Sequence, residues 1–288
     1  MTKYLMLLFI FLAVIFFSSC GRGTANQTGE RHDLPFAEAA VNYDYMRYSY
    51  VFVDLFDTVS RVIGYARSQE EFYYFSRDII YAELYRLSKL FDGFNSHEGI
   101  NNIKVINESA GIYPVEVHPD IIQMLHAGID AYHKTNGAVN MAIGPVTSIW
   151  REYISRGEEV LPSLDKLQAA GALTSITDVI INEEKNTVFL RHAGMSLDVG
   201  SIGKGFAIEQ AAQKAFDAGF SSFVLSVGGD VRLFGGPIGG SRDTWGIGVT
   251  DPFHPGEITE AIFAANTAVF TSGNYLRFYV VDGYGITI

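Results

Sequence analysis

The stretch "SLDVGSIGKGFAIEQAAQKAF", from Ser196 to Phe216, constrains the fold more than any other part of the chain. Small residues and one lysine, Lys204, separate an apolar segment typical of a strand end from a segment with helical spacing. We therefore predict a strand, a turn and a helix over residues 197–216, with Ser201 to Gly205 at the helix entrance. Two interpretations follow: a tight structural turn, or a site for phosphate and metal.

A glycine-rich turn that leads into a helix can bind an anion, because the N–H groups of the first helical turn lie at the positive end of the helix dipole. The phosphate loop of nucleoside triphosphatases is excluded, because it needs glycine at the position of Asp198 and a hydroxyl residue at the position of Gly205. The dinucleotide pattern G-x-G-x-x-G does not fit either. The turn alone leaves both interpretations open.

Hydrophobic periodicity predicts an α+β protein, a single unit of mixed β-sheets flanked by helices, in one or two lobes. Apolar alternation predicts strands within residues 45–66, around the acidic turn 182–186, and on both sides of Gly228-Gly229. Helical spacing predicts further helices within residues 68–94, 118–137 and 161–172. Ser68 and Glu71 form a capping box at the start of the first of these helices, and Pro119 suits the first position of the second.

The N-terminal segment predicts export and lipid attachment. An unbroken apolar run from Leu5 to Phe17 follows Lys3; it is shorter than the roughly 20 residues of a membrane span and typical of a signal peptide. Ser18 and Ser19 then lead to Cys20, as in a bacterial lipoprotein cleavage box. We expect a lipoprotein signal peptide at residues 1–19, a flexible tether at 20–35 and the folded domain at 36–288. A lipid on Cys20 would hold the protein at the outer face of the bacterial cytoplasmic membrane; the alternative is an uncleaved anchor helix.

Charge and histidine spacing exclude two classes of function. The formal net charge of −11 argues against nucleic acid as a partner, since such binding needs a basic surface. The seven histidines show no metal-ligand spacing, so we expect them to be solvated or structural.

Four glycine-rich segments, in order along the chain, resemble the motifs of the ApbE family, the FAD:protein FMN transferases. The family's T-x-G-A-F-D-x-x-x-G-P-x-x-x-x-W is similar to "TNGAVNMAIGPVTSIW" at 135–150, and its D-L-G-x-I-A-K-G-Y-A-x-D to "DVGSIGKGFAIE" at 198–209. Its N-A-G-G-D-I-R is similar to "SVGGDVR" at 226–232, and its T-S-G-D-Y-x-R-F to "TSGNYLRF" at 271–278. Four ordered motifs, spread over half of the chain, make the resemblance specific.

The resemblance implies a Mg²⁺-dependent enzyme that transfers FMN from its substrate FAD to a Ser or Thr hydroxyl of an acceptor protein. Lys204 would then face the phosphates, Asp198 would order the turn or bind the adenosine half, and the backbone carbonyl of Ser201 would bind the metal. Lys204 and Asp198 are thus the candidate catalytic residues. The implied cofactor-binding residues are Phe56, Phe94, Ala138, Val139, Asn140, Asp198 and Lys204.

Two departures from the family pattern change what we expect of this chain. Asn140 replaces the aspartate of G-A-F-D, which removes a charge. The closing "DGYGITI" does not match the family's H-I-I-D-P segment, so we expect the C-terminal part of the domain, with its side-chain metal ligands, to be missing. We accordingly expect the chain as given to bind FAD weakly and to transfer FMN inefficiently. The alternatives are a lipoprotein that binds FAD or hydrolyses it to FMN and AMP without efficient transfer, and a generic substrate-binding lipoprotein, against which the motif order argues.

Overall fold

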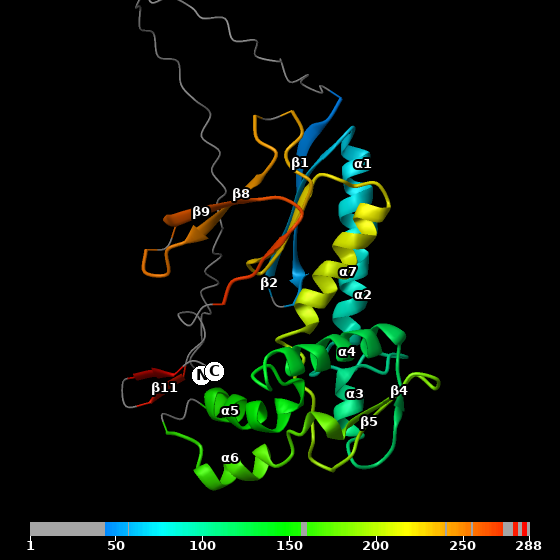
Figure 1. Ribbon diagram of the computed structural model, residues 1–288, viewed down its shortest axis with the longest axis vertical. Coiled ribbons are helices and arrows are strands. Elements are labelled where there is room, and N and C mark those ends of the chain that lie inside the picture. The colour runs from blue at the N-terminus through cyan, green and yellow to red at the C-terminus, as the bar shows by residue number, and fades with distance from the viewer. Residues whose placement is uncertain are drawn as a thin grey trace, which may run out of the picture.

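The computed structural model describes residues 44–56, 58–156, 160–239, 241–254, 256–272, 279–281 and 284–286. The predicted signal peptide, the tether with Cys20, and Asp57 lie outside the described residues. The described chain is a mixed α+β structure, as the sequence predicts, with an upper part built on one sheet and a lower part built mainly of helices (Figure 1).

Five antiparallel strands form the main sheet, in the order β1-β2-β6-β7-β10. Both hairpins predicted from apolar alternation are present, one formed by β1 and β2 and the other by β6 and β7. Pairing of β2 with β6 then joins segments that lie far apart in the sequence. The strand bounds are β1 Met46–Leu55, β2 Thr58–Ala66, β6 Phe223–Val227, β7 Asp230–Phe234 and β10 Ala268–Val269.

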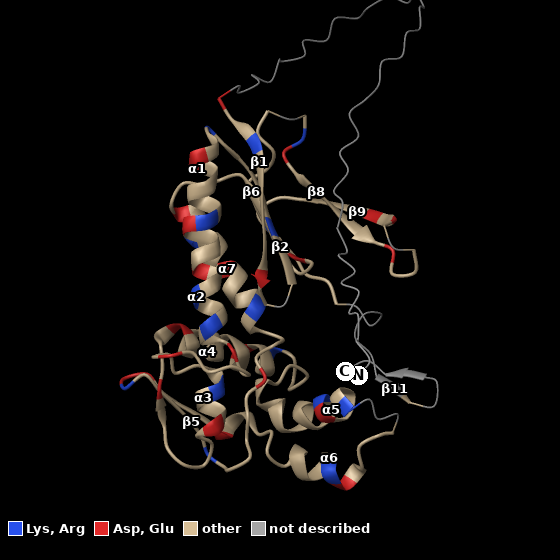
Figure 2. Ribbon diagram, turned by 180° about the vertical axis from the view of Figure 1, so that it is seen from behind, with Lys and Arg blue, Asp and Glu red and all other residues tan. Residues whose placement is uncertain are grey.

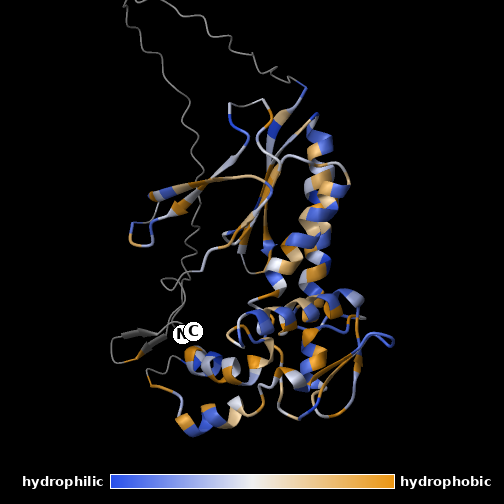
Figure 3. Ribbon diagram, in the orientation of Figure 1, coloured by the Kyte–Doolittle hydropathy of each residue, from blue (hydrophilic) through white to orange (hydrophobic). Residues whose placement is uncertain are grey.

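Two long helical segments lie side by side on one face of this sheet (Figure 1). The first is continuous through α1 (Gln69–Tyr73), a π-helix (Tyr74–Tyr81) and α2 (Ala82–Leu90), and the second is α7 (Gly203–Asp217). Ser68 caps the first segment by accepting a hydrogen bond from the N–H of Glu71, as the capping box predicts. Hydrophobic and hydrophilic residues alternate around these helices (Figure 3), because only one side of each is buried against the sheet.

On the opposite face of the sheet, the Trp245 end of the hairpin of β8 (Trp245–Thr250) and β9 (Ile258–Ala264) packs against the strands, while most of β9 is exposed. Trp245 packs there against Ile63, Val224, Val231 and Leu233, and its indole N–H donates to the carbonyl of Phe234 at 3.2 Å. Trp245 is a core residue, since it is 3% exposed.

The lower part contains the predicted helices α4 (Pro119–Lys134) and α6 (Leu164–Gly171), and the predicted pair β4 (Val179–Asn182) and β5 (Thr187–Leu190). Sequence periodicity missed two helices, α3 (Ile103–Glu108) and α5 (Gly144–Arg156). The remaining elements are β3 Val115–Glu116, the 3-10 turns Met141–Ile143 and Ile176–Asp178, β11 Tyr279–Val281 and β12 Tyr284–Ile286.

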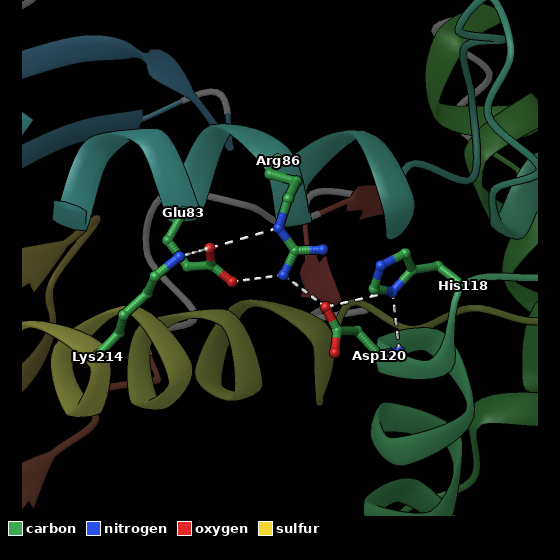
Figure 4. A network of polar contacts seen from close by, with 5 residues as sticks. All are labelled: Glu83, Arg86, His118, Asp120 and Lys214. Atoms are coloured by element: carbon green, nitrogen blue, oxygen red, sulfur yellow. Dashed lines mark hydrogen bonds and ion pairs between the residues drawn. The ribbon is translucent and has the colours of Figure 1, made fainter. Parts of the chain in front are cut away.

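One hydrophobic core runs through both parts, with members from β1 and α2 above to α4 and β5 below. Polar contacts join the parts as well: Arg86 on α2 contacts both Glu83 on the same helix and Asp120 on α4, while Lys214 on α7 contacts Glu83 (Figure 4). Acidic and basic residues occur on helices of both parts (Figure 2). In the part of the chain that the structure describes, no helix has the length and apolar character needed to cross a bilayer.

Candidate functional site

Helix α7 begins at the predicted position, but no strand precedes it. The turn at residues 200–202 leads directly into Gly203, with Lys204 and Gly205 in the first helical turn. The prediction of a strand before the turn is wrong, because the side chain of Asn107 takes the place of a neighbouring strand. Its amide accepts from the N–H of Leu197 at 2.7 Å and donates to the Leu197 carbonyl at 3.0 Å.

The entrance of α7 suits an anion. The N-cap residue is Ile202, whose side chain has no atom that can accept a hydrogen bond from the first-turn N–H groups. The N–H of Gly203 donates to the carbonyl of Val199 at 2.7 Å, which holds the turn closed. The N–H groups of the next two residues therefore lie at the positive helix end, beside the exposed Ser201.

Lys204 is held by an ion pair rather than extended into solvent. Its Nζ lies 2.8 Å from Oδ2 of Asp230, a buried carboxylate at the start of β7. A second ion pair joins the same helix and strand, since Arg232 donates to both carboxylate oxygens of Glu209. These two contacts fix the hairpin of β6 and β7 against α7, so residues of two successive motif segments meet.

Close backbone packing brings two further segments to the same place. Gly228 and Gly229 form the two-residue turn between β6 and β7, with φ of 59° and 92°. A Cβ at Gly228 would lie 2.6 Å from Oγ1 of Thr58, and one at Gly229 would lie 3.2 Å from Oγ1 of Thr271. The site thus combines the start of α7, the glycine turn, the start of β2 and the segment after β10.

A second cluster lies on the other side of the turn. Asp198 accepts from the N–H of Gly200 at 3.1 Å through Oδ1, so it orders the turn, one of its two expected roles. Its Oδ2 accepts from Thr147 Oγ1 at 2.8 Å and forms an ion pair with Arg151. The guanidinium of Arg151 also lies over the ring of Phe94, 5.1 Å from its centroid.

Phe94 is presented by a loop that Asp92 organises. The Asp92 carboxylate accepts from the N–H groups of Phe94 and Asn95 and lies 3.0 Å from His97 Nε2. Burial alone raises the pKa of Asp92, but the N–H groups of Asn95 and Phe94 outweigh it and hold the pKa below its ordinary value. The loop therefore places the ring of Phe94 beside Arg151 of α5. Phe94 remains 67% exposed there.

The other predicted binding residues have varied surroundings. Both polar atoms of the Asn140 amide form hydrogen bonds within the protein: Oδ1 caps the 3-10 turn at the N–H of Ala142, and Nδ2 donates to the carbonyl of Thr174. Ala138 is exposed and Val139 is half-buried just before this cap. Phe56 packs against the core with φ of 54° at the tight connection of β1 and β2. Their binding roles stay predictions.

Sequence reasoning missed Arg151 and Thr147, which reach Asp198 from α5. They are four residues apart and so share one face of a helix. Gly144-Pro145 at the start of that helix is the signal that could have indicated it, since proline suits the first helical turn. No local signal points to the pairing of Arg151 with Asp198, which lie 47 residues apart.

Two features lie away from this cluster of segments. A cavity of about 550 Å³ is bordered by α2, residues 99–101 and residues 116–118, and none of the predicted site residues lines it. In the described part of the chain, Asp251, His254 and Glu257 are the one group of three acidic or histidine residues close enough to share a metal. They lie on the loop between β8 and β9, where Asp251 already accepts hydrogen bonds from the N–H groups of Phe253 and His254.

Comparison with known proteins assigns the family. The family model described as "ApbE family" matches residues 56–288, more than half of the chain and including all four motif segments. The chain belongs to the ApbE family. Sequence relatives include an FAD:protein FMN transferase of Klebsiella pneumoniae, 31% identical over 179 residues, which cover 62% of this chain and 54% of that protein. Another, from Treponema pallidum, is 28% identical over 193 residues, covering 63% of this chain and 53% of that protein.

Solved structures agree on the ApbE fold. The ApbE protein of Thermotoga maritima superposes with a TM-score of 0.71 at 24% identity, covering 83% of this chain and 74% of that chain. The flavinyl transferase ApbE of Pseudomonas stutzeri superposes with a TM-score of 0.68 at 18% identity, covering 82% of this chain and 73% of that chain. The chain spans about half the length of the curated relatives that it matches.

Proposed function

We propose that this ApbE-family chain acts in FAD:protein FMN transfer, moving FMN from FAD to a Ser or Thr hydroxyl of an acceptor protein. The observation that carries the proposal is the meeting of distant motif segments at the entrance of α7, where Lys204 and the first-turn N–H groups lie together. The K. pneumoniae and T. pallidum relatives are FAD:protein FMN transferases, which supports the same activity.

The reaction is a phosphoryl transfer. The acceptor hydroxyl oxygen attacks the FMN phosphorus, the bond from that phosphorus to the bridging oxygen breaks, and AMP leaves with the bridging oxygen. The hydroxyl proton passes to solvent or a base, so atoms and charge balance. Such reactions depend on positioning and on neutralising phosphate charge. Lys204 and the helix N–H groups supply positive charge there, while Asp198 keeps the turn in shape.

Mg²⁺ is part of the proposal, and the turn offers it a fitting donor. Ser201 is exposed at the turn, and Mg²⁺ prefers oxygen ligands, of which phosphates and waters usually supply several. The resemblance to the family implies the Ser201 carbonyl as the protein ligand, and the neighbouring carboxylates of Asp198 and Asp230 form ion pairs with Arg151 and Lys204. A bound Mg²⁺ would supply neutralisation of the pyrophosphate charge.

The function is tested by in-gel flavin fluorescence. The protein is incubated with FAD and Mg²⁺ in an extract of source cells that lack the gene, and covalent flavin is detected on a denaturing gel. We expect a weak fluorescent band that EDTA abolishes, in line with the inefficient transfer expected from the sequence. Lys204→Ala should lower the rate by roughly 10²–10³, the usual cost of one charge stabiliser. Lys134→Ala is the matched control, because Lys134 is exposed and forms an ion pair with Asp130, one turn earlier on α4.

The assay also separates the alternative activity. Chromatography of the same mixtures detects FMN and AMP released when water replaces the acceptor hydroxyl. Release of FMN without a labelled protein would favour FAD hydrolysis, and a chain that neither binds nor cleaves FAD would contradict the proposed function. We further propose attachment to the membrane through a lipid on Cys20, on the basis of the N-terminal sequence.

A further inference from the structure

Arg151 makes three contacts at once, and each reaches a different segment of the site. From α5 it forms an ion pair with Asp198, donates to Thr147 Oγ1 at 2.9 Å and lies over the ring of Phe94. The planar guanidinium suits this combination, since it can stack on a ring while its edge donates to oxygen atoms. Arg151 is therefore the residue through which α5 joins the Phe94 loop to the turn before α7.

The carboxylate that Arg151 contacts, that of Asp198, lies at the turn before α7. Asp198 is two residues before Gly200 and six before Lys204, at the turn whose N–H groups and lysine are proposed to receive the FAD pyrophosphate. That pyrophosphate is an anion, so an uncompensated carboxylate beside it would repel it. The chain as a whole carries a formal charge of −11, which adds to the need for local compensation.

Both carboxylates at this helix entrance are paired with a cation. Asp230 is paired with Lys204, and Asp198 is paired with Arg151, whose side chain remains 42% exposed. The two pairs differ in origin: Lys204 lies in a motif segment, whereas Arg151 lies one residue beyond the motif segment 135–150. The neutralisation of Asp198 by Arg151 thus involves a residue that lies outside the four motif segments.

We propose that Arg151 is a positioning residue that sets the affinity for FAD, by neutralising Asp198 and by holding the ring of Phe94 in place. The proposal rests on the proposed function. Loss of the guanidinium leaves the Asp198 charge facing the pyrophosphate and frees the Phe94 ring. The chemical step itself depends on Lys204 and the helix N–H groups, so Arg151 acts on FAD binding and on KM more than on kcat.

Calorimetric titration with FAD, in Mg²⁺ and without acceptor, tests the proposal. We expect Arg151→Gln to raise the Kd about tenfold, because the uncompensated carboxylate of Asp198 then repels the pyrophosphate across a partly solvated, screened distance. Arg151→Lys keeps the charge but loses the planar fork, so its Kd rises less. Asp198→Asn removes the carboxylate charge, while the Asn oxygen still accepts from Gly200; in that background Arg151→Gln should raise the Kd less than about threefold relative to Asp198→Asn alone.

The controls distinguish the possible failures. Arg77→Gln, at an exposed arginine paired with its neighbour Asp78, should bind FAD like the parent. If the parent protein does not bind FAD, the proposed function fails. If the parent binds and Arg151→Gln binds equally well, the inference alone fails. A tenfold effect of Arg151→Gln in the Asp198→Asn background would also overturn it, because the loss would then not come from the Asp198 charge.

Discussion

At the scale of single residues, the turn of Gly228 and Gly229 shows how backbone conformation places the site. Gly228 has φ of 59° and leaves no room for a Cβ beside Thr58. We expect Gly228→Ala to lower the free energy of unfolding by about 1–3 kcal/mol through strain and crowding. Gly171→Ala is the control, since Gly171 ends α6 with open space around it, and there alanine should raise stability by about 0.5 kcal/mol. Urea denaturation measures both, and equal effects would contradict the assignment.

Asn140 is a second residue whose identity has a structural reason. Its amide both accepts and donates, whereas an aspartate carboxylate would face the carbonyl oxygen of Thr174 without a proton to share. We expect Asn140→Asp to lower the free energy of unfolding at pH 7 by about 1–3 kcal/mol, the cost of an unsatisfied polar group. Thermal unfolding monitored by circular dichroism checks this. Unchanged stability would mean that the Thr174 carbonyl accepts a hydrogen bond from another donor in the variant.

At the scale of elements, α2, α4 and α7 are held together by charged side chains around Glu83 (Figure 4). His118 belongs to the same group, since it caps α4 by accepting from the N–H of Asp120 through Nδ1. Burial alone raises the pKa of Glu83, but hydrogen bonds from Arg86 and Lys214 outweigh it and hold the pKa below its ordinary value. The ionised carboxylate is therefore the form that stabilises the fold.

The pH dependence of stability follows from the direction of this shift. A folded-state pKa below the unfolded value, about 4.3, means that the contribution is complete above that pH and is lost as the pH falls through the folded pKa. We expect Glu83→Gln to be less stable than the parent by about 1–2 kcal/mol at pH 7, with the difference shrinking toward pH 3. Urea unfolding from pH 3 to 7 measures this, with the exposed Glu108→Gln as control. A difference that does not change with pH would exclude the charge as its cause.

At the scale of the whole molecule, the continuous core predicts that the upper and lower parts unfold together. Trp245 reports on the sheet of the upper part, and Trp150 reports on α5 in the lower part. We expect the single-tryptophan variants Trp150→Phe and Trp245→Phe to show fluorescence transitions that coincide with the loss of circular dichroism in each variant. An earlier transition for Trp245 would show that the β8-β9 hairpin unfolds separately.

The lipid anchor is also a property of the whole molecule. We expect Cys20→Ser to remain unprocessed or to be released from the membrane, since the acylated cysteine is the proposed attachment point. Detergent partitioning and gel mobility of the full chain measure this. Unchanged partitioning and size in the variant would contradict lipid attachment and favour an anchor helix.

The sequence by itself determined the features that depend on neighbours along the chain. The cap at Ser68, the start of α4 at Pro119 and the turn at Gly228-Gly229 all follow from local backbone preferences, and the four motif segments indicated the family. Local patterns could not show that the backbone N–H and carbonyl of Leu197 form hydrogen bonds with the side chain of Asn107, 90 residues earlier. The predicted strand there was therefore wrong.

The tertiary structure alone decided which side chains meet. The pairing of Lys204 with Asp230 and that of Arg151 with Asp198 arise only after β7 and α5 pack beside the entrance of α7. The physical reason is that an ion pair depends on distance in space, which the periodicity of a single segment does not encode. A motif can therefore place Lys204 at a helix entrance, while the fold decides which charges surround it.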